Sequence, residues 1–146
     1  MTSSNMRTLQ TLLGGNAADL NKNRTSDDFD QGLREFYDPD IEVHQPACLP
    51  HGGVHRGVDN WLNARRIMMS TWEQKLDLLN IYEDVEKNVI ILNFVLDWTA
   101  RSTNRNFRMP AVEVLTFRDA KIAKIEVYPQ DARVMAESLE PLPVAD

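Results

Sequence analysis

Glu113 is the side chain in this sequence whose position most strongly suggests chemistry. It stands among apolar residues on one face of an expected strand over 107–117, and the other face of that strand is apolar as well. A carboxylate in such a place is costly unless it is paired or protonated. One interpretation is an ion pair with an arginine, or exposure at a sheet edge. The other is a general acid or base in a pocket, where desolvation would raise its pKa toward neutrality and suit it to proton transfer.

Asp97 is a second acidic candidate, on an expected strand over 89–100. One face of that strand carries Asn93 and Asp97 among apolar residues, while the other face carries apolar side chains alone. A sheet that is apolar on both sides suggests that one side lines an internal cavity and that a partner subunit covers the other. On that interpretation Asp97 points into the cavity beside Glu113. On the alternative interpretation Asp97 is solvated.

Polar residues around a loop rich in proline and glycine add further candidates. In an expected strand over 41–45, Gln45 shares a face with apolar residues, which favours it as a pocket residue. His44 points the other way, where a surface or structural histidine is more common than a catalytic one. His51 suits a hydrogen-bond donor at the pocket rim, with solvation as the alternative. His51 and His55 have no third ligand at the spacing of a metal site, so we expect no bound metal.

Three helices are expected before the main sheet. Apolar residues recur at helical spacing over 6–20, but Gly14 and Gly15 interrupt them, and each glycine costs about 1 kcal/mol inside a helix. The first helix should therefore be broken or kinked there. The pattern over 29–37 predicts a second helix, which a following proline ends, and an apolar stripe over 59–70 predicts a third.

The second half of the chain is expected to form most of the sheet. Four segments alternate or run apolar, and the links between them are short and polar, which is typical of antiparallel hairpins. These segments are 75–83, 89–100, 107–117 and 121–128. A last helical segment follows over 131–140. The order of the elements predicts an α+β fold, with helices gathered on one face of a strongly curved antiparallel sheet.

Apolar side chains of the last strand and of the third helix should face the interior. Ile125 and Val127 share the apolar face of the last strand, and Trp61 lies on the apolar stripe of the third helix. If the interior holds a pocket, we expect these three residues to contact the substrate.

Composition and charge limit the class of protein. The chain has 146 residues, 42% hydrophobic and 26% charged, which indicates one globular domain over 1–146 with ends that fray at 1–5 and 141–146. A net charge of −6 with scattered basic residues argues against nucleic-acid binding. Cys48 is the single cysteine, so no internal disulfide forms, and no apolar run is long enough for a membrane span or signal peptide. We expect a cytoplasmic protein without a membrane partner.

Two segments resemble a known family. The run DIEVHQPACLPHGGVHRG over 40–57 is similar to the first strand and following loop of SnoaL-like proteins of the nuclear-transport-factor-2-like superfamily, where an L-P-aromatic-G-G-x-x-x-G loop leads into the third helix. The run over 107–128 is similar to the closing hairpin of the same group. The resemblance covers nearly the whole chain after Asn16. It implies a cone-shaped, curved antiparallel sheet wrapped around helices, an internal apolar pocket open at one end, and a homodimer through the outer sheet face.

The resemblance also implies a range of activities that need no cofactor or metal. Members include ketosteroid isomerases, polyketide cyclases, limonene-epoxide hydrolases, dehydratases and non-catalytic binding domains. The isomerases' catalytic base falls on Gln45 and their protonated oxyanion-hole acid on Glu113. The cyclases' histidine also falls on Glu113, and their last-strand aspartate falls on Val127. The epoxide hydrolases' strand aspartate matches Asp97, while their arginine falls on Val95. No constellation is intact.

Two functions follow as hypotheses. The first is a cofactor-independent enzyme of secondary or degradative metabolism that isomerises, cyclises or dehydrates a small, mostly apolar polyketide, terpenoid or steroid. Glu113 would carry the proton, Asp97 or His44 would be the second acid–base group, and Gln45 and His51 would orient a carbonyl or hydroxyl. The second is a non-catalytic dimeric domain that binds a small molecule or serves a larger enzyme.

Overall fold

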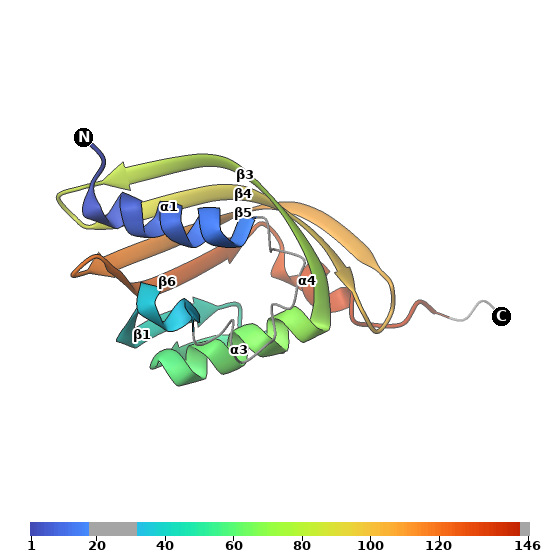
Figure 1. Cartoon of the computed structure of the whole chain (residues 1–146). Helices are drawn as coiled ribbons and strands as arrows, with labels where there is room; N and C mark the ends of the chain where they lie inside the picture. Colours follow the sequence, from blue (N-terminus) through green and yellow to red (C-terminus); the bar gives the residue numbers. More distant parts are fainter. Residues whose placement is uncertain (18–31, 144–146) are drawn as a thin grey trace.

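One six-stranded sheet organises the computed structural model, which describes residues 1–17 and 32–143. The strands lie in the order β2-β1-β6-β5-β4-β3, and all neighbours are antiparallel except β1 and β6, which are parallel. Their bounds are β1 Tyr37–Gln45, β2 Gly53–Arg56, β3 Trp72–Asp84, β4 Val89–Ala100, β5 Asn106–Arg118 and β6 Lys121–Pro129. The sheet is strongly curved and keeps two open edges, β2 and β3 (Figure 1).

The described helices lie mostly inside this curve. Figure 1 shows α1 (Ser4–Ala17) and α3 (Val58–Thr71) on the concave side of the sheet, with the short α4 (Ala132–Glu137) following β6. A 3-10 turn, η1 (Arg34–Phe36), leads into β1. These observations confirm the α+β class and the curved sheet wrapped around helices.

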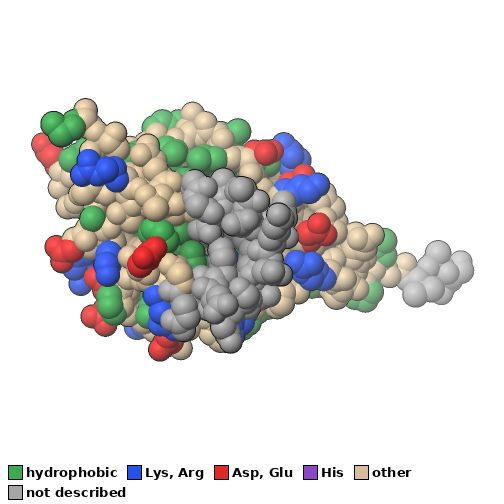
Figure 2. Space-filling model, viewed as in Figure 1, with side chains coloured by type: hydrophobic (Ala, Val, Ile, Leu, Met, Phe, Trp, Pro, Cys, Tyr) green, Lys and Arg blue, Asp and Glu red, His purple; other side chains and the backbone are tan. Residues whose placement is uncertain are grey.

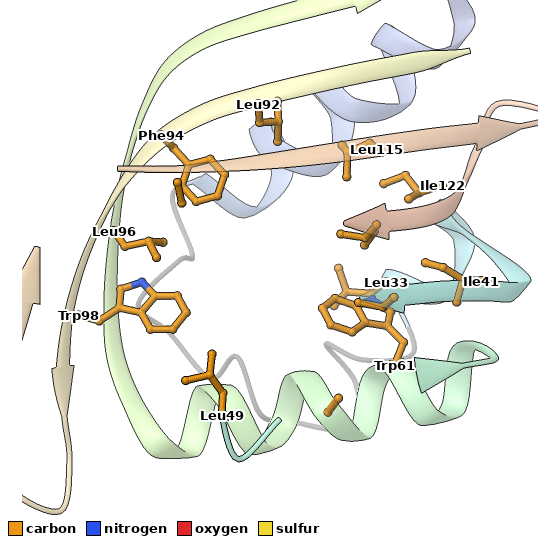
Figure 3. Packing of buried hydrophobic residues seen from close by; sticks show 14 of the residues in the cluster. Leu33, Ile41, Leu49, Trp61, Leu92, Phe94, Leu96, Trp98, Leu115 and Ile122 are labelled. Carbon is orange, nitrogen blue, oxygen red and sulfur yellow. The ribbon is translucent and has the colours of Figure 1, made fainter. Parts of the chain in front are cut away.

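Alternation along the strands decides which side chains reach the interior. On β4, buried residues alternate with half-buried ones, so Phe94, Leu96 and Trp98 point to the concave side. A single cluster of buried apolar side chains extends from Leu9 in α1 to Met135 in α4, and Figure 3 shows part of it. The concave face of the sheet is therefore the wall of the core, which establishes which of the two apolar faces is internal.

The first helix differs from the expectation. Helix α1 continues through Gly14 and Gly15, so the predicted break is wrong. Leu9 on this helix is almost completely buried, and such tertiary packing outweighs a cost of about 1 kcal/mol per glycine. Two of the residues in the segment 1–5 are hydrogen-bonded to distant parts of the chain: Ser3 donates to Glu83, and Asn5 donates to Asn88 at 3.0 Å.

The second expected helix is largely replaced or lies outside the described residues. Residues 29–31 are not described, and 34–36 form a 3-10 turn. Tyr37 already belongs to β1, because its backbone pairs with Ile122 and its ring packs edge-on against Trp61, with centroids 6.2 Å apart. Tyr37 therefore belongs to the sheet, and the helix predicted for this residue from its spacing is wrong.

The surface is mixed in charge. On the face drawn in Figure 2, basic and acidic side chains are interspersed, with small apolar areas between them. Over residues 1–17 and 32–143, no helix combines the length and the apolar character needed to cross a lipid bilayer.

Candidate active site

A cavity of about 180 Å³ lies between the concave face of the sheet and α3. Side chains from β1, α3, β3, β4, β5, β6, α4 and the loop after β1 surround it. They are Gln45, Pro46, Leu49, His51, Trp61, Arg65, Met68, Met69, Gln74, Leu76, Phe94, Leu96, Trp98, Glu113, Val127, Pro129 and Met135. Most of this wall is apolar or aromatic, as in typical small-molecule sites, with a few polar groups that converge on the space.

Glu113 is the acidic group of this cavity. In the sheet it pairs with Leu92 of β4 and Val127 of β6, so its carboxyl projects from the concave face among apolar neighbours. Burial raises the pKa of Glu113 to about 7, and no cation or hydrogen-bond donor in the described part of the chain opposes this rise. At neutral pH the carboxyl is therefore divided between its protonated and ionised forms, so it can both accept and release a proton.

His51 is the second titratable group on the wall. The residue is 1% exposed, and within residues 1–17 and 32–143 neither ring nitrogen has a hydrogen-bond partner. Burial, with a smaller contribution from His55, lowers the pKa of His51 to about 4. The ring is thus neutral near pH 7 and offers one donor and one acceptor nitrogen.

The loop before β2 fixes the position of His51. Its backbone turns tightly, with Leu49 N donating to Pro46 O at 3.2 Å and Gly52 N donating to Leu49 O at 2.8 Å. A Cβ atom on Gly52 would lie 2.1 Å from Pro46 O, so only glycine permits this approach. The His51 ring then packs edge-on against Trp72, with centroids 5.6 Å apart.

Two tryptophans form the aromatic walls. Figure 3 shows Trp61 and Trp98 on opposite sides of the interior, Trp61 from α3 and Trp98 from β4. Their indole Nε1 atoms are buried and, among the described residues, have no hydrogen-bond partner. Trp98 is fixed by Trp72 and Phe107, at centroid distances of 5.5 and 5.8 Å.

Gln45 and Val127 lie where the sheet opens. The parallel pairing of β1 and β6 ends at His44 and Glu126, and the next residues, Gln45 and Val127, line the cavity. A second, more open groove of about 410 Å³ shares four wall residues with the cavity. They are Gln45, Pro46, Val127 and Pro129. The end of the β1–β6 ladder is thus a thin wall between the interior and the outside.

Comparison with known proteins identifies the fold. No protein-family model matches the sequence, and a comparison with curated proteins finds no match. Among solved structures, an NTF2-like protein of unknown function from Burkholderia pseudomallei K96243 superposes with a TM-score of 0.77, covering 95% of this chain and 99% of that one at 19% identity. The chain has the NTF2-like fold. The expectation drawn from the resemblance is confirmed at the level of the fold.

Two further structures share this NTF2-like fold. A candidate SnoaL-like polyketide cyclase from Jannaschia sp. CCS1 matches with a TM-score of 0.74, over 94% of this chain and 93% of that one, at 12% identity. TerC, co-crystallised with polyporic acid, also matches with a TM-score of 0.74, over 94% of this chain and 99% of that one, at 17% identity. At these identities the fold alone is shared, and function has to be inferred from the residues of the cavity.

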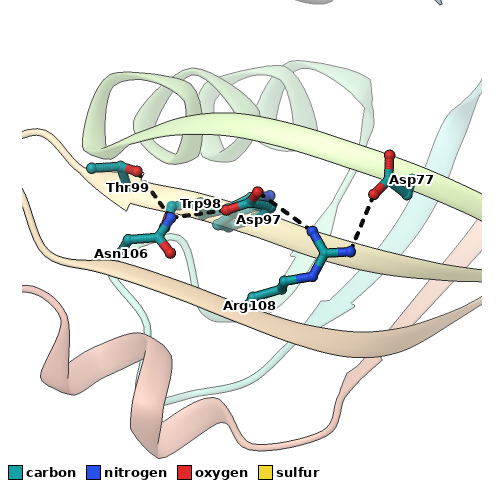
Figure 4. A network of polar contacts seen from close by, with 6 residues as sticks. All are labelled: Asp77, Asp97, Trp98, Thr99, Asn106 and Arg108. Carbon is teal, nitrogen blue, oxygen red and sulfur yellow. Dashed lines mark hydrogen bonds and ion pairs between the residues drawn. The ribbon is translucent and has the colours of Figure 1, made fainter.

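Asp97 does not lie in the cavity. Figure 4 shows it on the outer face of the sheet, where it accepts a hydrogen bond from Asn106 at 2.9 Å and pairs with Arg108 at 3.5 Å. Arg108 also pairs with Asp77 at 3.5 Å. The expectation that Asp97 points toward Glu113 is wrong, because the β4–β5 register places the two carboxyls on opposite faces.

His44 and Ile125 also fall outside the cavity. The His44 ring lies 2.7 Å from a carboxylate oxygen of Glu42, on the face of β1 opposite Gln45, and contributes to the outer groove. Ile125 is 2% exposed in the hydrophobic core and does not line the cavity. Since neither side chain reaches the interior space, neither can act there as the acid–base or substrate-contacting group that was expected.

Sequence reasoning missed several residues of the cavity. Arg65 is 5% exposed, lines the cavity and is engaged by other groups of the chain. The apolar stripe that Arg65 interrupts in α3 was the signal that could have marked it. Met68, Gln74 and Trp98 carry no such signal, because core and cavity-lining side chains follow the same periodicity. Within the described residues, no group of three or more His, Cys, Asp or Glu side chains could hold a metal ion.

Proposed function

We propose that this protein is a cofactor-independent acid–base enzyme that isomerises a small, mostly apolar carbonyl compound, with Glu113 as the proton carrier. The observation that carries the proposal is a lone carboxyl in an apolar cavity whose pKa is raised to about 7 by burial. A group with a pKa near the working pH is the most effective proton carrier, since both of its forms are populated.

The chemistry needs a single proton-transferring side chain. The Glu113 carboxylate removes a proton from the carbon between a carbonyl and a double bond, which gives a carboxylic acid and a dienolate. The acid then returns the proton to the far carbon, the double bond moves into conjugation, and the carboxylate is restored. Dehydration needs a second acid for the leaving hydroxyl, and His51, with a pKa of about 4, is not protonated at neutral pH. The residues therefore favour isomerisation.

Neutral polar groups can stabilise the oxyanion. His51 and Gln45 both line the cavity, and each carries an N–H that can donate to the developing enolate oxygen. A neutral imidazole is sufficient for this role, because its N–H stabilises the oxyanion by donating a hydrogen bond and does not have to transfer the proton. The candidate SnoaL-like polyketide cyclase that shares the fold is consistent with acid–base chemistry in this family, while the assignment to this chain rests on Glu113.

The Glu113→Gln variant tests the proposal. With 3-cyclohexen-1-one as the probe, the wild-type protein should produce 2-cyclohexen-1-one, with a rate that rises with pH and is half-maximal near pH 7, because the carboxylate is the active form. The variant should lose about 10²- to 10⁴-fold in rate, since an amide cannot exchange the proton. Absorbance of the conjugated product measures both rates.

The matched control is Glu86→Gln, the same change in the exposed turn between β3 and β4, away from the cavity. This variant should keep the wild-type rate. An undiminished rate in Glu113→Gln would remove Glu113 from the mechanism. Binding of the probe without any isomerisation by the wild-type protein would instead support the non-catalytic binding domain.

We also propose that two copies of the chain pair through the outer face of β4 and β5. Ile91, Val95, Val112 and Val114 leave an apolar, partly exposed strip on this face of the single chain. Sedimentation equilibrium should show a dimer for the wild type and a monomer for Val112→Glu, because a charge in an apolar interface is unpaired. A monomeric wild-type protein, or a dimeric Val112→Glu variant, would contradict this interface.

A further inference from the structure

We propose that the substrate is an uncharged compound of one ring that bears a carbonyl or hydroxyl oxygen; this inference rests on the proposed function of Glu113 and narrows it. Three properties of the cavity carry it: its volume, the unequal stiffness of its walls, and the charges of its polar groups. Each limits the substrate in a different way.

Volume limits the number of rings. The cavity measures about 180 Å³, and an apolar protein cavity of about 150 Å³ accommodates benzene. One six-membered ring with a short substituent therefore fills the space. On the same scale a second fused ring, which adds four carbons to the first, needs more than this space, and a four-ring steroid needs more still. The polyketide and steroid classes that the family resemblance suggested are thus too large for this cavity.

The aromatic wall on the β4 side is stiff. Trp98 packs against Trp72 and Phe107, and the Trp72 Nε1 donates to Ser138 Oγ at 2.9 Å, which ties this wall to the residue after α4. Trp98 is therefore held from behind and cannot retreat from a larger ligand without breaking this packing.

The part of the wall formed by Met68 is softer. Met68 of α3 lines the cavity and is half-buried. Its side chain is unbranched and flexible, so this position tolerates substitution by a smaller residue better than the packed aromatic wall does. Ile67, the next residue on the same helix, is 36% exposed and does not line the cavity. The two positions thus form a matched pair, one that bounds the space and one that does not.

Charge limits the substrate to neutral compounds. The acidic group Glu113 faces the cavity, and the cation there, Arg65, is already engaged within the chain. A carboxylate substrate would lie near the Glu113 carboxyl, and repulsion between like charges disfavours this arrangement. The polar groups left for a ligand, Gln45 and His51, are neutral hydrogen-bonding groups suited to a carbonyl or hydroxyl oxygen.

Calorimetric binding of three probes tests the inference. The wild-type protein should bind 4-methylphenol (one ring, neutral) at least about tenfold more tightly than 2-naphthol (two rings) or benzoate (one ring, charged). Met68→Ala should strengthen 2-naphthol binding by about tenfold or more, and Ile67→Ala should not change it. Met68→Phe reduces the cavity volume and should therefore weaken 4-methylphenol binding. This second variant tests the same wall position if Met68→Ala does not fold.

The outcomes separate this inference from the proposed function. Tight wild-type binding of 2-naphthol, or failure to bind any one-ring probe, would overturn the size limit. Benzoate that binds as well as 4-methylphenol would overturn the charge limit. None of these results concerns proton transfer, which the Glu113→Gln rate tests. Conversely, selective binding of 4-methylphenol without isomerisation of 3-cyclohexen-1-one would uphold the ligand class and refute the enzyme.

Discussion

The Glu113→Gln variant should be more stable than the wild-type protein at pH 8, by about 3 kcal/mol. The pKa of Glu113 rises from 4.5 to about 7 on folding, and a tenfold change in proton affinity corresponds to about 1.4 kcal/mol. The folded state holds a proton that the unfolded chain releases between these two values. This contribution to stability is therefore complete below about pH 4.5 and is lost as pH rises through 7. Glutamine carries no charge at any pH, so the variant does not lose this stability as pH rises.

Urea unfolding at pH 5 and pH 8 measures this effect. The wild-type protein should lose stability from Glu113 between the two values, and the variant should not. Glu86→Gln, in the exposed turn between β3 and β4, is the control and should follow the wild type. A variant less stable than the wild type at pH 8 would mean that a partner stabilises the Glu113 carboxylate, which contradicts a desolvated carboxyl at this position.

The His51→Phe variant should keep its stability in acid where the wild-type protein loses about 3 kcal/mol. Burial lowers the pKa of His51 from 6.5 to about 4, so the unfolded chain binds a proton that the folded protein refuses. This contribution to stability is present above about pH 6.5 and is lost as pH falls through 4. Phenylalanine has no such proton and keeps an edge-on ring contact with Trp72.

The two groups oppose each other over a shared range of pH. Between about pH 4.5 and 6.5 the Glu113 and His51 contributions change in opposite directions, so they nearly cancel in the wild type. Unfolding measured across this range should show stability rising with pH in Glu113→Gln and falling with pH in His51→Phe. The double variant should be as flat as the wild type. Parallel curves for both single variants would refute the assignment of these pKa changes.

The sequence predicts the position of Glu113 in the cavity wall well, because one acidic residue among apolar neighbours on a strand is a strong local signal. It predicts Asp97 badly for a different reason. Alternation shows which residues share a face, but when both faces of β4 are apolar it does not show which face is internal. That choice depends on the direction in which the sheet curves and on the position of α3, which are properties of the whole fold.

His51 shows a second limit of sequence reasoning. A loop rich in glycine and proline normally lies at the surface, and this favoured a rim or solvated position for the histidine. The structure buries it because Gly52 allows the backbone to approach Pro46 closely and turns the loop inward. The same limit applies to Tyr37. Its spacing predicts a helix, but the residue pairs with β6 and its ring contacts Trp61. Contacts between distant segments override the local pattern in both cases.

The placement of the aromatic wall has a practical consequence. The chain contains three tryptophans, and all of them are buried around the cavity, Trp61 and Trp98 on its wall and Trp72 directly behind Trp98. Indole emission depends on polarity and on nearby quenching groups, and the tryptophan fluorescence of this protein comes entirely from the neighbourhood of the site. Entry of any compound into the interior should therefore change the emission spectrum without a label, and the chain can serve as its own optical sensor when candidate substrates are screened.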